Sequence, residues 1–549
     1  MDAADRARTE AALRALYEQG EEYVRQYRAL SRRDFAAVYP LVFGYVRARF
    51  LLQADMCPSE ALFDLADVSL RRILALRREG VQAGEIARSC AGASSVISKK
   101  ILLFKAMGDS FGFSVSPEDF ARITTVTELT RYILSAGSEP EAAESAHETS
   151  VGPFDPETVR ADFPALVEKV HGQALVYLDN AATAQMPRPA LDALVQAERL
   201  RGNVHRAVHT PGERSTALYE SARRDCAAFL GAKPEQLVFT SGTTDGIGRV
   251  ADALASLPGG VVTTAMEHHA NFVPWQQTCR RLGRPFRVCP VDADGRLDMD
   301  ALAALLTPDI SVLAVTHASN VLGTVNDVRT ICALAHERGV RVLVDGAQSA
   351  CHRPVDVEAI GCDWFVCSGH KLGGPFGIGL LYCREALPPV RFGGGMVDTV
   401  TEAESTFLPM PSGAEAGTPN VSGAAALAAA LRYRMALPDG WRAHEAKLLA
   451  MTAALLAAIP HVRVLGRGER EGCLSFVVDG VSALDAALLL DGEAIALRSG
   501  NHCAQPLMAA LGVDYTLRVS PAFYNTEAEI ERFAAALRRV VTALRQSEG

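Results

Sequence analysis

The stretch WFVCSGHKLGGPFGIG, from Trp364 to Gly379, joins a short apolar β-rich run to a glycine-rich turn that contains Lys371. Runs of the same kind alternate with helical segments on both sides of it: QLVFTSG, VVTTAM, FRVCPV, SVLAVTHAS, RVLVDGA and GIGLLYC. Strands that alternate with helices indicate βαβ units and a mostly parallel sheet. Ligands of such sheets bind beyond the carboxyl ends of the strands, so the sequence predicts an α/β domain with a site near Lys371.

The rest of the chain divides by composition. Residues 1–136 have apolar residues at helical spacing and predict an all-α domain, and residues 137–152 are acidic and rich in Ser, Ala, Gly and Pro, which is typical of a flexible linker. Residues 153–420 form the predicted large α/β domain. Residues 421–549, where helical segments precede CLSFVVDG and TLRVSPAFYN, predict a smaller α+β domain, on which we expect the first segment of the large domain to pack.

The composition of the chain excludes several classes of function. The chain has 549 residues and a formal net charge of -9, which argues against general nucleic-acid binding. The charged N-terminus lacks a signal-peptide core, and no apolar run is long enough for a membrane span, so no membrane partner is expected. Twelve cysteines without a CxxC pair favour reduced thiols and a cytoplasmic location.

Two residues at neighbouring strand ends carry reactive groups. Lys371 follows Ser368, Gly369 and His370, and a lysine in such a place can form a Schiff base with an aldehyde; a solvated lysine in a glycine-rich turn is the alternative. Asp345 ends the run RVLVDGAQSA, with Gln348 three residues on, and a helix cap is the alternative for that carboxylate.

Three further motifs add polar groups. TSGTTDGIG follows the strand QLVF and opens a helix, whose N–H groups bind anions and whose Thr243 and Thr244 add hydroxyls; an ordinary capped helix is the alternative. MEHHANFVPW places His268 and His269 after a strand, where an imidazole can stack on a planar ring or serve as a catalytic acid–base. Adjacent residues of a strand face opposite sides, so we expect no shared metal ion. THASNVLGTV ends another strand with Asn320.

Together these groups supply an amine, a carboxylate, phosphate ligands and a ring to stack. That inventory matches pyridoxal 5'-phosphate: Asp345 would keep the pyridine nitrogen protonated, which makes the ring an electron sink, and Lys371 would form the Schiff base.

The motifs also resemble a known family. DNAAT, EHHAN, THASNVLGT, VDGAQ, SGHKLGGPFGIG, EAGTPN and RSGNHCAQPLM occur in order from Asp179 to Met508 and are similar to those of the group II (Suf-type) cysteine desulfurases, in the class V aminotransferase, fold-type I family. The resemblance covers about Asp155 to the C-terminus. It implies a pyridoxal-phosphate fold-type I large domain and a small C-terminal domain that carries a catalytic cysteine.

The resemblance implies a role for each matching residue. Lys371 carries the cofactor, and Asp345 pairs with its ring nitrogen. Arg498 and Arg518 clamp the substrate carboxylate, because guanidinium and carboxylate groups pair in a bidentate manner. The remaining cofactor roles are ring-hydroxyl contact for Gln348 and Asn320, stacking for His268, and phosphate binding for Thr244, Ser368 and His370. Thr418 reaches the phosphate of the partner subunit, and His205 and Arg206 line the partner subunit's substrate site. A homodimer would then be required for activity.

Cys503 is the nucleophile that this resemblance implies. Its thiolate would take the sulfur of L-cysteine, leaving L-alanine and a Cys503 persulfide, which then passes to a SufE- or SufU-like acceptor for iron–sulfur cluster assembly or a related pathway. The thiolate is the reactive form, and a polar, partly exposed loop beside His502 suits it. A passive loop thiol is the alternative.

The chain departs from the family pattern at several positions. Asn501 stands where a second histidine is common before the cysteine, Asp245 and Gly248 stand where Glu and Asn are common, and Gly413 and Ala414 replace an Arg-Phe pair. These departures put loop geometry, acceptor choice and substrate preference in doubt. Selenocysteine lyase or cysteine sulfinate desulfinase activity would share the cofactor site and depend less on Cys503. A non-catalytic scaffold is opposed by the presence of Lys371 and Asp345.

The N-terminal region lies outside this resemblance. Ile97 to Ser135 is similar to helices II to IV of an acyl carrier protein, but Ile97 stands where the carrier has its modified serine, with Ser95 and Ser98 only nearby. We therefore expect a degenerate carrier-like bundle used for docking. A functional phosphopantetheine carrier and an unrelated helical bundle are the alternatives.

Overall fold

The computed structural model describes residues 3–31, 33–79, 81, 96–113, 119, 122–136, 154–205 and 207–547. The chain forms two compact units, Met1–His147 and Glu148–Gly549. The predicted linker, Ser95 and much of FGFSVSPEDF lie outside the described residues.

The first unit is helical, as the sequence predicts. Leu13, Tyr45, Leu65, Leu103 and Ile133 contribute to one shared hydrophobic core of the unit. The Asp34 carboxylate accepts a hydrogen bond of 3.0 Å from the Ala37 N–H and so caps a helix start, as short acidic side chains do. The helices are α1 (Ala3–Ala29), α2 (Phe35–Arg49), α3 (Leu62–Arg78), α5 (Val96–Phe111) and α7 (Val126–Ala136).

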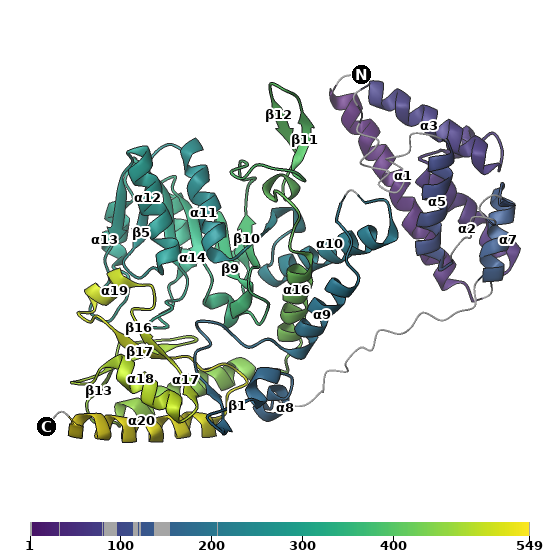
Figure 1. Cartoon of the computed structure of the whole chain (residues 1–549). Helices are drawn as coiled ribbons and strands as arrows, with labels where there is room; N and C mark the ends of the chain where they lie inside the picture. Colours follow the sequence, from purple (N-terminus) through teal and green to yellow (C-terminus); the bar gives the residue numbers. More distant parts are fainter. Residues whose placement is uncertain are drawn as a thin grey trace. The chain divides into compact units, whose positions relative to one another are not determined.

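The second unit is built on a seven-stranded sheet of order β4-β10-β9-β8-β7-β5-β6. Figure 1 labels β5, β9 and β10 of this sheet. Neighbours from β9 to β6 run parallel, and β10 is antiparallel to both β9 and β4, so the predicted mostly parallel sheet is confirmed. The strands are β4 (Leu237–Thr240), β5 (Gly260–Thr264), β6 (Phe286–Cys289), β7 (Ile310–Thr316), β8 (Arg341–Asp345), β9 (Trp364–Ser368) and β10 (Gly379–Cys383).

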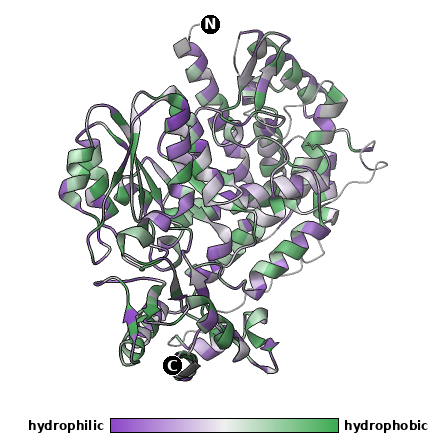
Figure 2. Ribbon diagram, turned by 60° about the vertical axis from the view of Figure 1, so that its left-hand side comes forward, coloured by the Kyte–Doolittle hydropathy of each residue, from purple (hydrophilic) through white to green (hydrophobic). Residues whose placement is uncertain are grey.

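Helices cover both faces of this sheet, because buried strands need apolar partners on each side. One core cluster joins the sheet to α10, α14 and α16, and another joins it to α11 and α12. Hydrophobic residues dominate the strands in Figure 2. The helices are α9 (Arg188–Arg199), α10 (Thr210–Leu230), α11 (Thr243–Ala253), α12 (Val273–Leu282), α13 (Met299–Leu305), α14 (Val328–His336), α15 (Val357–Ile360) and α16 (Val421–Met435). A hairpin of β11 (Val397–Val400) and β12 (Ser405–Phe407) precedes α16.

The C-terminal part forms a four-stranded antiparallel sheet, β13-β14-β17-β16, packed on α17, α18 and α20. A segment from the start of the unit joins it, since β3 pairs in parallel with β15. The elements are α8 (Pro156–Arg160), β1 (Lys169–Val170), β2 (Gln173–Ala174), β3 (Val176–Tyr177), α17 (Trp441–Ala457), β13 (Val462–Val464), β14 (Leu474–Val478), α18 (Ala483–Gly492), β15 (Ile495–Ala496), β16 (Arg498–Gly500), α19 (Gln505–Ala510), β17 (Thr516–Val519) and α20 (Glu527–Ser547).

No helix in the described part of the chain is long and apolar enough to cross a membrane.

Candidate active site

Lys371 lies in the turn that reverses the chain from β9 into the antiparallel β10. The Gly369 N–H donates to the Ile378 carbonyl at 2.9 Å, and Gly373 has φ +84°, a conformation that L side chains rarely adopt. The glycine-rich sequence is therefore what allows so tight a reversal beside the lysine. Burial lowers the pKa of the Lys371 amine, and the nearby Asp345 carboxylate opposes that shift.

Asp345 ends β8, the strand next to β9, so its carboxylate comes close to Lys371. One of its oxygens, Oδ1, accepts the Ala347 N–H at 2.9 Å, and no donor among the described residues bonds the other oxygen. Burial raises the pKa of this carboxyl, which the Ala347 N–H and Lys371 partly offset. Gln348 follows in the same turn and donates its amide to the Ala181 carbonyl at 2.8 Å.

The start of α11 lies against the end of β9. Ser368 Oγ accepts the Thr243 N–H at 2.9 Å and lies 2.8 Å from Thr243 Oγ1, whereas Thr244 is exposed. Gly242 precedes the helix and has no side chain to cap its first turn. His370 Nδ1 lies 3.2 Å from Thr183 Oγ1, and burial lowers the pKa of His370 to about 4, so its ring is neutral at pH 7.

His268 follows β5 and is also neutral. Its Nδ1 accepts the Ala270 N–H at 3.1 Å, which leaves the ring proton on Nε2. Burial and the charge of Lys371 lower the pKa of His268 to about 3. The preceding Glu267 is buried and accepts from the Asn271 amide, Thr264 Oγ1 and the Thr316 N–H at 2.6 to 2.9 Å. This network fixes the backbone that presents His268.

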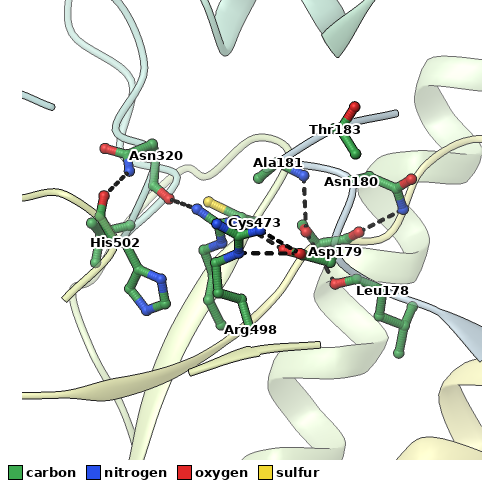
Figure 3. Close-up of polar contacts among 12 residues, drawn as sticks. Leu178, Asp179, Asn180, Ala181, Thr183, Asn320, Cys473, Arg498 and His502 are labelled. Carbon is green, nitrogen blue, oxygen red and sulfur yellow. Dashed lines mark hydrogen bonds and ion pairs between the residues drawn. The ribbon is translucent and has the colours of Figure 1, made fainter. Parts of the chain in front are cut away.

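Arg498 and Arg518 lie opposite each other on β16 and β17 and share one acidic partner, Asp179. Asp179 Oδ2 accepts from Arg498 Nε at 3.1 Å (Figure 3). Its Oδ1 accepts from Arg518 Nη2 at 3.0 Å. Arg518 Nη1 donates to the Asn320 carbonyl at 2.8 Å, while Arg518 Nε is buried without a hydrogen-bond partner among the described residues.

Cys503 is exposed in the loop between β16 and α19. The Asn320 amide donates to the His502 carbonyl at 2.8 Å (Figure 3) and the His269 N–H donates to the Cys503 carbonyl at 2.6 Å. The Asn501 side chain accepts the Cys503 N–H at 3.1 Å. His502 is buried, with Nε2 2.7 Å from Thr516 Oγ1, and burial lowers its pKa to about 3. The loop is therefore anchored to the strand ends that carry His268 and Asn320.

The other described cysteines contrast with Cys503. Cys57 is half-buried, and nine are buried: Cys226, Cys279, Cys289, Cys332, Cys351, Cys362, Cys367, Cys383 and Cys473. Burial raises the pKa of all nine thiols.

Thr418 and His205 stand apart from this cluster within one chain. Both are exposed, and no hydrogen bond or ion pair seen in the described residues joins either of them to Lys371, Asp345 or Cys503. His205 has φ +68° and lies 3.8 Å from Glu220. Arg206 lies outside the described residues.

The loop that carries Thr418 is anchored by Glu415, whose side chain is 10% exposed. Its carboxylate pairs with Arg223 at 2.7 Å and accepts from the Tyr219 hydroxyl at 2.8 Å and the Phe239 N–H at 2.7 Å. Glu415 thereby ties this loop to α10 and β4.

Sequence reasoning overlooked several of the groups that organise the site. Asp179 stands in the motif DNAAT, but nothing in a linear sequence shows that a carboxylate there meets two arginines more than 300 residues away. Glu267 directly precedes the two histidines, and an isolated acidic residue in a buried strand end is a signal that could have identified it. Thr183 had no local signal.

The residues present fit pyridoxal 5'-phosphate. Lys371, whose pKa is lowered, lies beside the buried Asp345, which has one oxygen without a donor among the described residues. The neutral imidazole of His268 follows β5. The start of α11, whose N-cap residue is Gly242, can receive a phosphate. No group of three His, Cys, Asp or Glu side chains suited to a metal ion occurs in the described part of the chain.

Comparison with known proteins agrees with this geometry. Residues 176–533 match the family model described as aminotransferase class-V. A cysteine desulfurase of Cronobacter sakazakii is 44% identical over 401 residues, which cover 70% of this chain and 98% of that protein. One of Synechococcus elongatus is 41% identical over 447 residues, which cover 79% of this chain and 71% of that protein.

Solved structures give the same result. A crystal structure of an Escherichia coli cysteine desulfurase in an S-sulfonic acid form matches with a TM-score of 0.66 and 39% identity, covering 71% of this chain and 100% of that chain. An apo cysteine desulfurase of Thermococcus onnurineus matches with a TM-score of 0.67 and 36% identity, covering 71% and 98%. Enzymes of this kind use pyridoxal 5'-phosphate. The chain belongs to the cysteine desulfurase family of class-V aminotransferases.

Proposed function

We propose that the protein converts L-cysteine to L-alanine and collects the sulfur as a persulfide on Cys503. The observation that carries this proposal is the exposed Cys503 on a loop that Asn320 and His269 hydrogen-bond to the strand ends around Lys371. Relatives named as cysteine desulfurases, which align over nearly their whole length, support it.

The chain's own residues divide the work. Bound pyridoxal 5'-phosphate supplies an electron sink next to the substrate α-carbon. Lys371 would hold the aldehyde, and its lowered pKa lets the amine accept and return a proton. Asp345 would keep the ring nitrogen protonated, and the neutral His268 would stack on the ring. Gln348 and Asn320 would contact the ring hydroxyl.

The start of α11 would receive the phosphate. We assign its binding to Ser368, His370 and Thr244, as the family resemblance implies. Thr243 joins this group because its hydroxyl and N–H both contact Ser368. Thr418 of the partner subunit would complete the phosphate site.

Sulfur transfer needs no outside oxidant or reductant. The Cys503 thiolate donates an electron pair to the substrate sulfur and forms the S–S bond. The carbon–sulfur bond breaks, and the carbon keeps that electron pair and takes a proton, so that L-alanine leaves. Arg498 and Arg518 would hold the substrate carboxylate throughout, because guanidinium groups can pair with a carboxylate in a bidentate manner.

We propose that the protein acts as a homodimer. Large apolar side chains are exposed on α9, α10, α16 and the loops beside them, which is typical of a subunit interface: Val195, Leu200, Val208, Leu218, Phe376 and Met435. These elements lie together, since α9 and α10 pack on α16 and the Asn420 amide donates to the Gly377 carbonyl at 3.1 Å. The exposed His205 and Thr418, with Arg206, would then complete the partner's site.

We further propose that the enzyme is of the group II subtype, acts in the cytoplasm, and passes its sulfur to a SufE- or SufU-like acceptor. The exposure of Cys503 supports transfer to another protein, because an acceptor thiolate must reach the persulfide. Free thiols throughout the described residues suit a reducing compartment.

The N-terminal region, residues 1–136, remains a docking domain in this proposal, joined by the linker at 137–152. The Synechococcus relative aligns with 79% of this chain, which is more than Glu148–Gly549 contains, so that match includes part of the first unit. This supports the proposal that the N-terminal region has a role that at least one other cysteine desulfurase shares.

The experiment is to measure alanine and sulfide release from L-cysteine by the purified holoenzyme, with dithiothreitol present, for the wild type, Cys503→Ala and Cys57→Ala. Cys57 is the matched control, since it is the other described cysteine that is not buried. Loss of both products in Cys503→Ala alone, with the visible absorbance of the bound cofactor retained, supports the proposal. Equal release by Cys503→Ala would favour the lyase or desulfinase reaction, and a wild type without cofactor absorbance would favour the scaffold.

A further inference from the structure

We infer that Asp179 is a positioning residue that holds Arg498 and Arg518 in place and sets the net charge of the substrate carboxylate site, so that the site selects amino acids with a single carboxylate. The inference rests on the proposed function, because it takes the two arginines as the ligands of the substrate carboxylate.

The backbone around Asp179 is rigidly placed. Asp179 forms a parallel bridge with Ser520, which follows β17, and the Ser520 N–H donates to the Leu178 carbonyl at 2.8 Å. The Asn180 amide donates to the Ser520 carbonyl at 2.8 Å (Figure 3). The carboxylate therefore belongs to the same framework as the strand that carries Arg518.

The two arginines need such a partner. Arg498 and Arg518 are direct antiparallel partners on β16 and β17, and two like charges at such positions repel each other. Asp179 divides its oxygens between them: Oδ2 lies 3.1 Å from Arg498 Nε and 3.0 Å from Arg498 Nη2, and Oδ1 lies 3.0 Å from Arg518 Nη2. One carboxylate thus orients both guanidinium groups.

Donors remain for a ligand after Asp179 is satisfied. A guanidinium carries five N–H groups, and Arg518 uses Nη1 on the Asn320 carbonyl and Nη2 on Asp179. The Arg518 side chain is only 3% exposed, and its Nε is buried and has no hydrogen-bond partner among the described residues. This nitrogen is closed to solvent, so a bound carboxylate would reach it only after a side-chain movement, whereas the guanidinium of Arg498, whose side chain is 49% exposed, is directly accessible.

The same three residues determine the net charge of the substrate carboxylate site. Two arginines and one aspartate leave a net charge of about +1 in the cluster, which a single carboxylate neutralises. A substrate with a second acidic group brings an additional negative charge close to Asp179. Without the aspartate the cluster would carry about +2 and would favour a dianion.

The test compares Asp179→Asn with Asp252→Asn in the holoenzyme. Asp252 is a matched control, because it also bridges two arginines, Arg281 at 3.3 Å and Arg391 at 2.8 Å, but belongs to α11 away from β16 and β17. KM and kcat are measured for L-cysteine. Thermal shifts are measured for L-alanine, with one carboxylate, and L-aspartate, with two, because a ligand that binds the folded state raises Tm.

We expect Asp179→Asn to raise KM for L-cysteine about tenfold with kcat changed less than about threefold, which is the pattern of lost binding that ground and transition states share. The apparent affinity for L-alanine should fall by about the same factor, and the preference for L-alanine over L-aspartate should fall or reverse. Asp179→Glu, which keeps the charge but moves it, should raise KM and retain the preference.

An unchanged or lower KM in Asp179→Asn, or an equal effect of Asp252→Asn, would overturn the inference. If Asp179→Asn does not fold, Asp179→Glu still decides, because loss of its preference for L-alanine would contradict a charge-based role. Failure of the proposed function would give a different result, because the wild type would then release no alanine from L-cysteine. The thermal shifts with L-alanine and L-aspartate would still measure the effect of Asp179 on ligand binding.

Discussion

The backbone N–H of His269 donates a hydrogen bond of 2.6 Å to the carbonyl oxygen of Cys503. The His269 ring adds a second contact, since its Nε2 accepts the Gln505 N–H at 3.3 Å. Next to these contacts, the backbone of His502 and Cys503 has positive φ, +52° and +55° respectively. Left-handed backbone costs roughly 1–2 kcal/mol for each non-glycine residue, so the loop keeps this shape only because its neighbours hold it.

Removing the ring of His269 should therefore loosen the loop without touching the cofactor site. In His269→Ala we expect kcat for L-cysteine to fall about fivefold and Cys503 to react severalfold faster with iodoacetamide, because one hydrogen bond of about 1 kcal/mol is lost. The cofactor absorbance should stay unchanged. His171→Ala, which removes an exposed histidine elsewhere, is the control. Unchanged kcat and alkylation rate would show that the backbone bond alone holds the loop.

Glu267 should give the protein a distinctive pH dependence. Burial raises the pKa of its carboxyl to about 8, above the unfolded value, so the folded state binds this proton more tightly. Its contribution is complete below the unfolded pKa and is lost as pH rises toward 8. The free energy of unfolding of the wild type, relative to Glu267→Gln, should fall by about 2 kcal/mol between pH 6 and pH 7.5.

Urea denaturation of the holoenzyme at several pH values measures this difference. Glu267→Gln will itself be less stable, because its amide meets the amide of Asn271, so the slope with pH and not the absolute value is the result. Parallel curves for the two proteins would mean that Glu267 keeps its charge in the folded state.

Glu415 should matter for stability far more than an exposed acid does. Glu415→Gln leaves the buried Arg223 with an incomplete partner, and breaking a buried ion pair costs about 3–5 kcal/mol. Asp225→Asn, which loses a half-exposed pair with Arg432, should cost at most about 1 kcal/mol. Chemical denaturation compares the two variants. A similar small loss in both would mean that the Glu415 network contributes little to folding.

Phe376 provides a direct test of the homodimer. Its side chain is 75% exposed in the single chain and stacks on the His370 ring at 5.6 Å. Phe376→Glu should yield a monomer in sedimentation velocity and lower activity more than about tenfold, because a charge cannot be buried in an apolar interface without a partner. Val167→Glu, on an exposed apolar residue that precedes β1, is the control. A dimer of normal activity in Phe376→Glu would place the interface elsewhere.

The sequence was most informative where local rules apply. Short apolar runs between helices predicted the sheet, and the structure confirms its mostly parallel order. The glycines after Lys371 indicated a turn, and Gly373 and Gly377 have positive φ, which other residues rarely adopt. Asp345 and Lys371, at the ends of β8 and β9, are adjacent because parallel strands bring their carboxyl ends to one edge.

Contacts between residues far apart in the chain could not be predicted from these local patterns. The bonding of Ser368 to Thr243 depends on how α11 enters the sheet, and Thr244, one residue further along that helix, is exposed. The partnership of Asp179 with Arg498 and Arg518 depends on a strand bridge across more than 300 residues. No periodicity or spacing encodes such a contact, since it is made by the tertiary fold.

The burial of nine cysteines limits which thiols of this chain could accept sulfur from a persulfide. A persulfide moves between sulfur atoms only when a thiolate attacks it, and burial both raises the pKa of these thiols and keeps them out of reach. If Cys503 carries the persulfide, as we propose, none of these nine buried thiols is placed to take its sulfur. Within the described part of the second unit, the sulfur would then be passed on to a thiolate that arrives from outside.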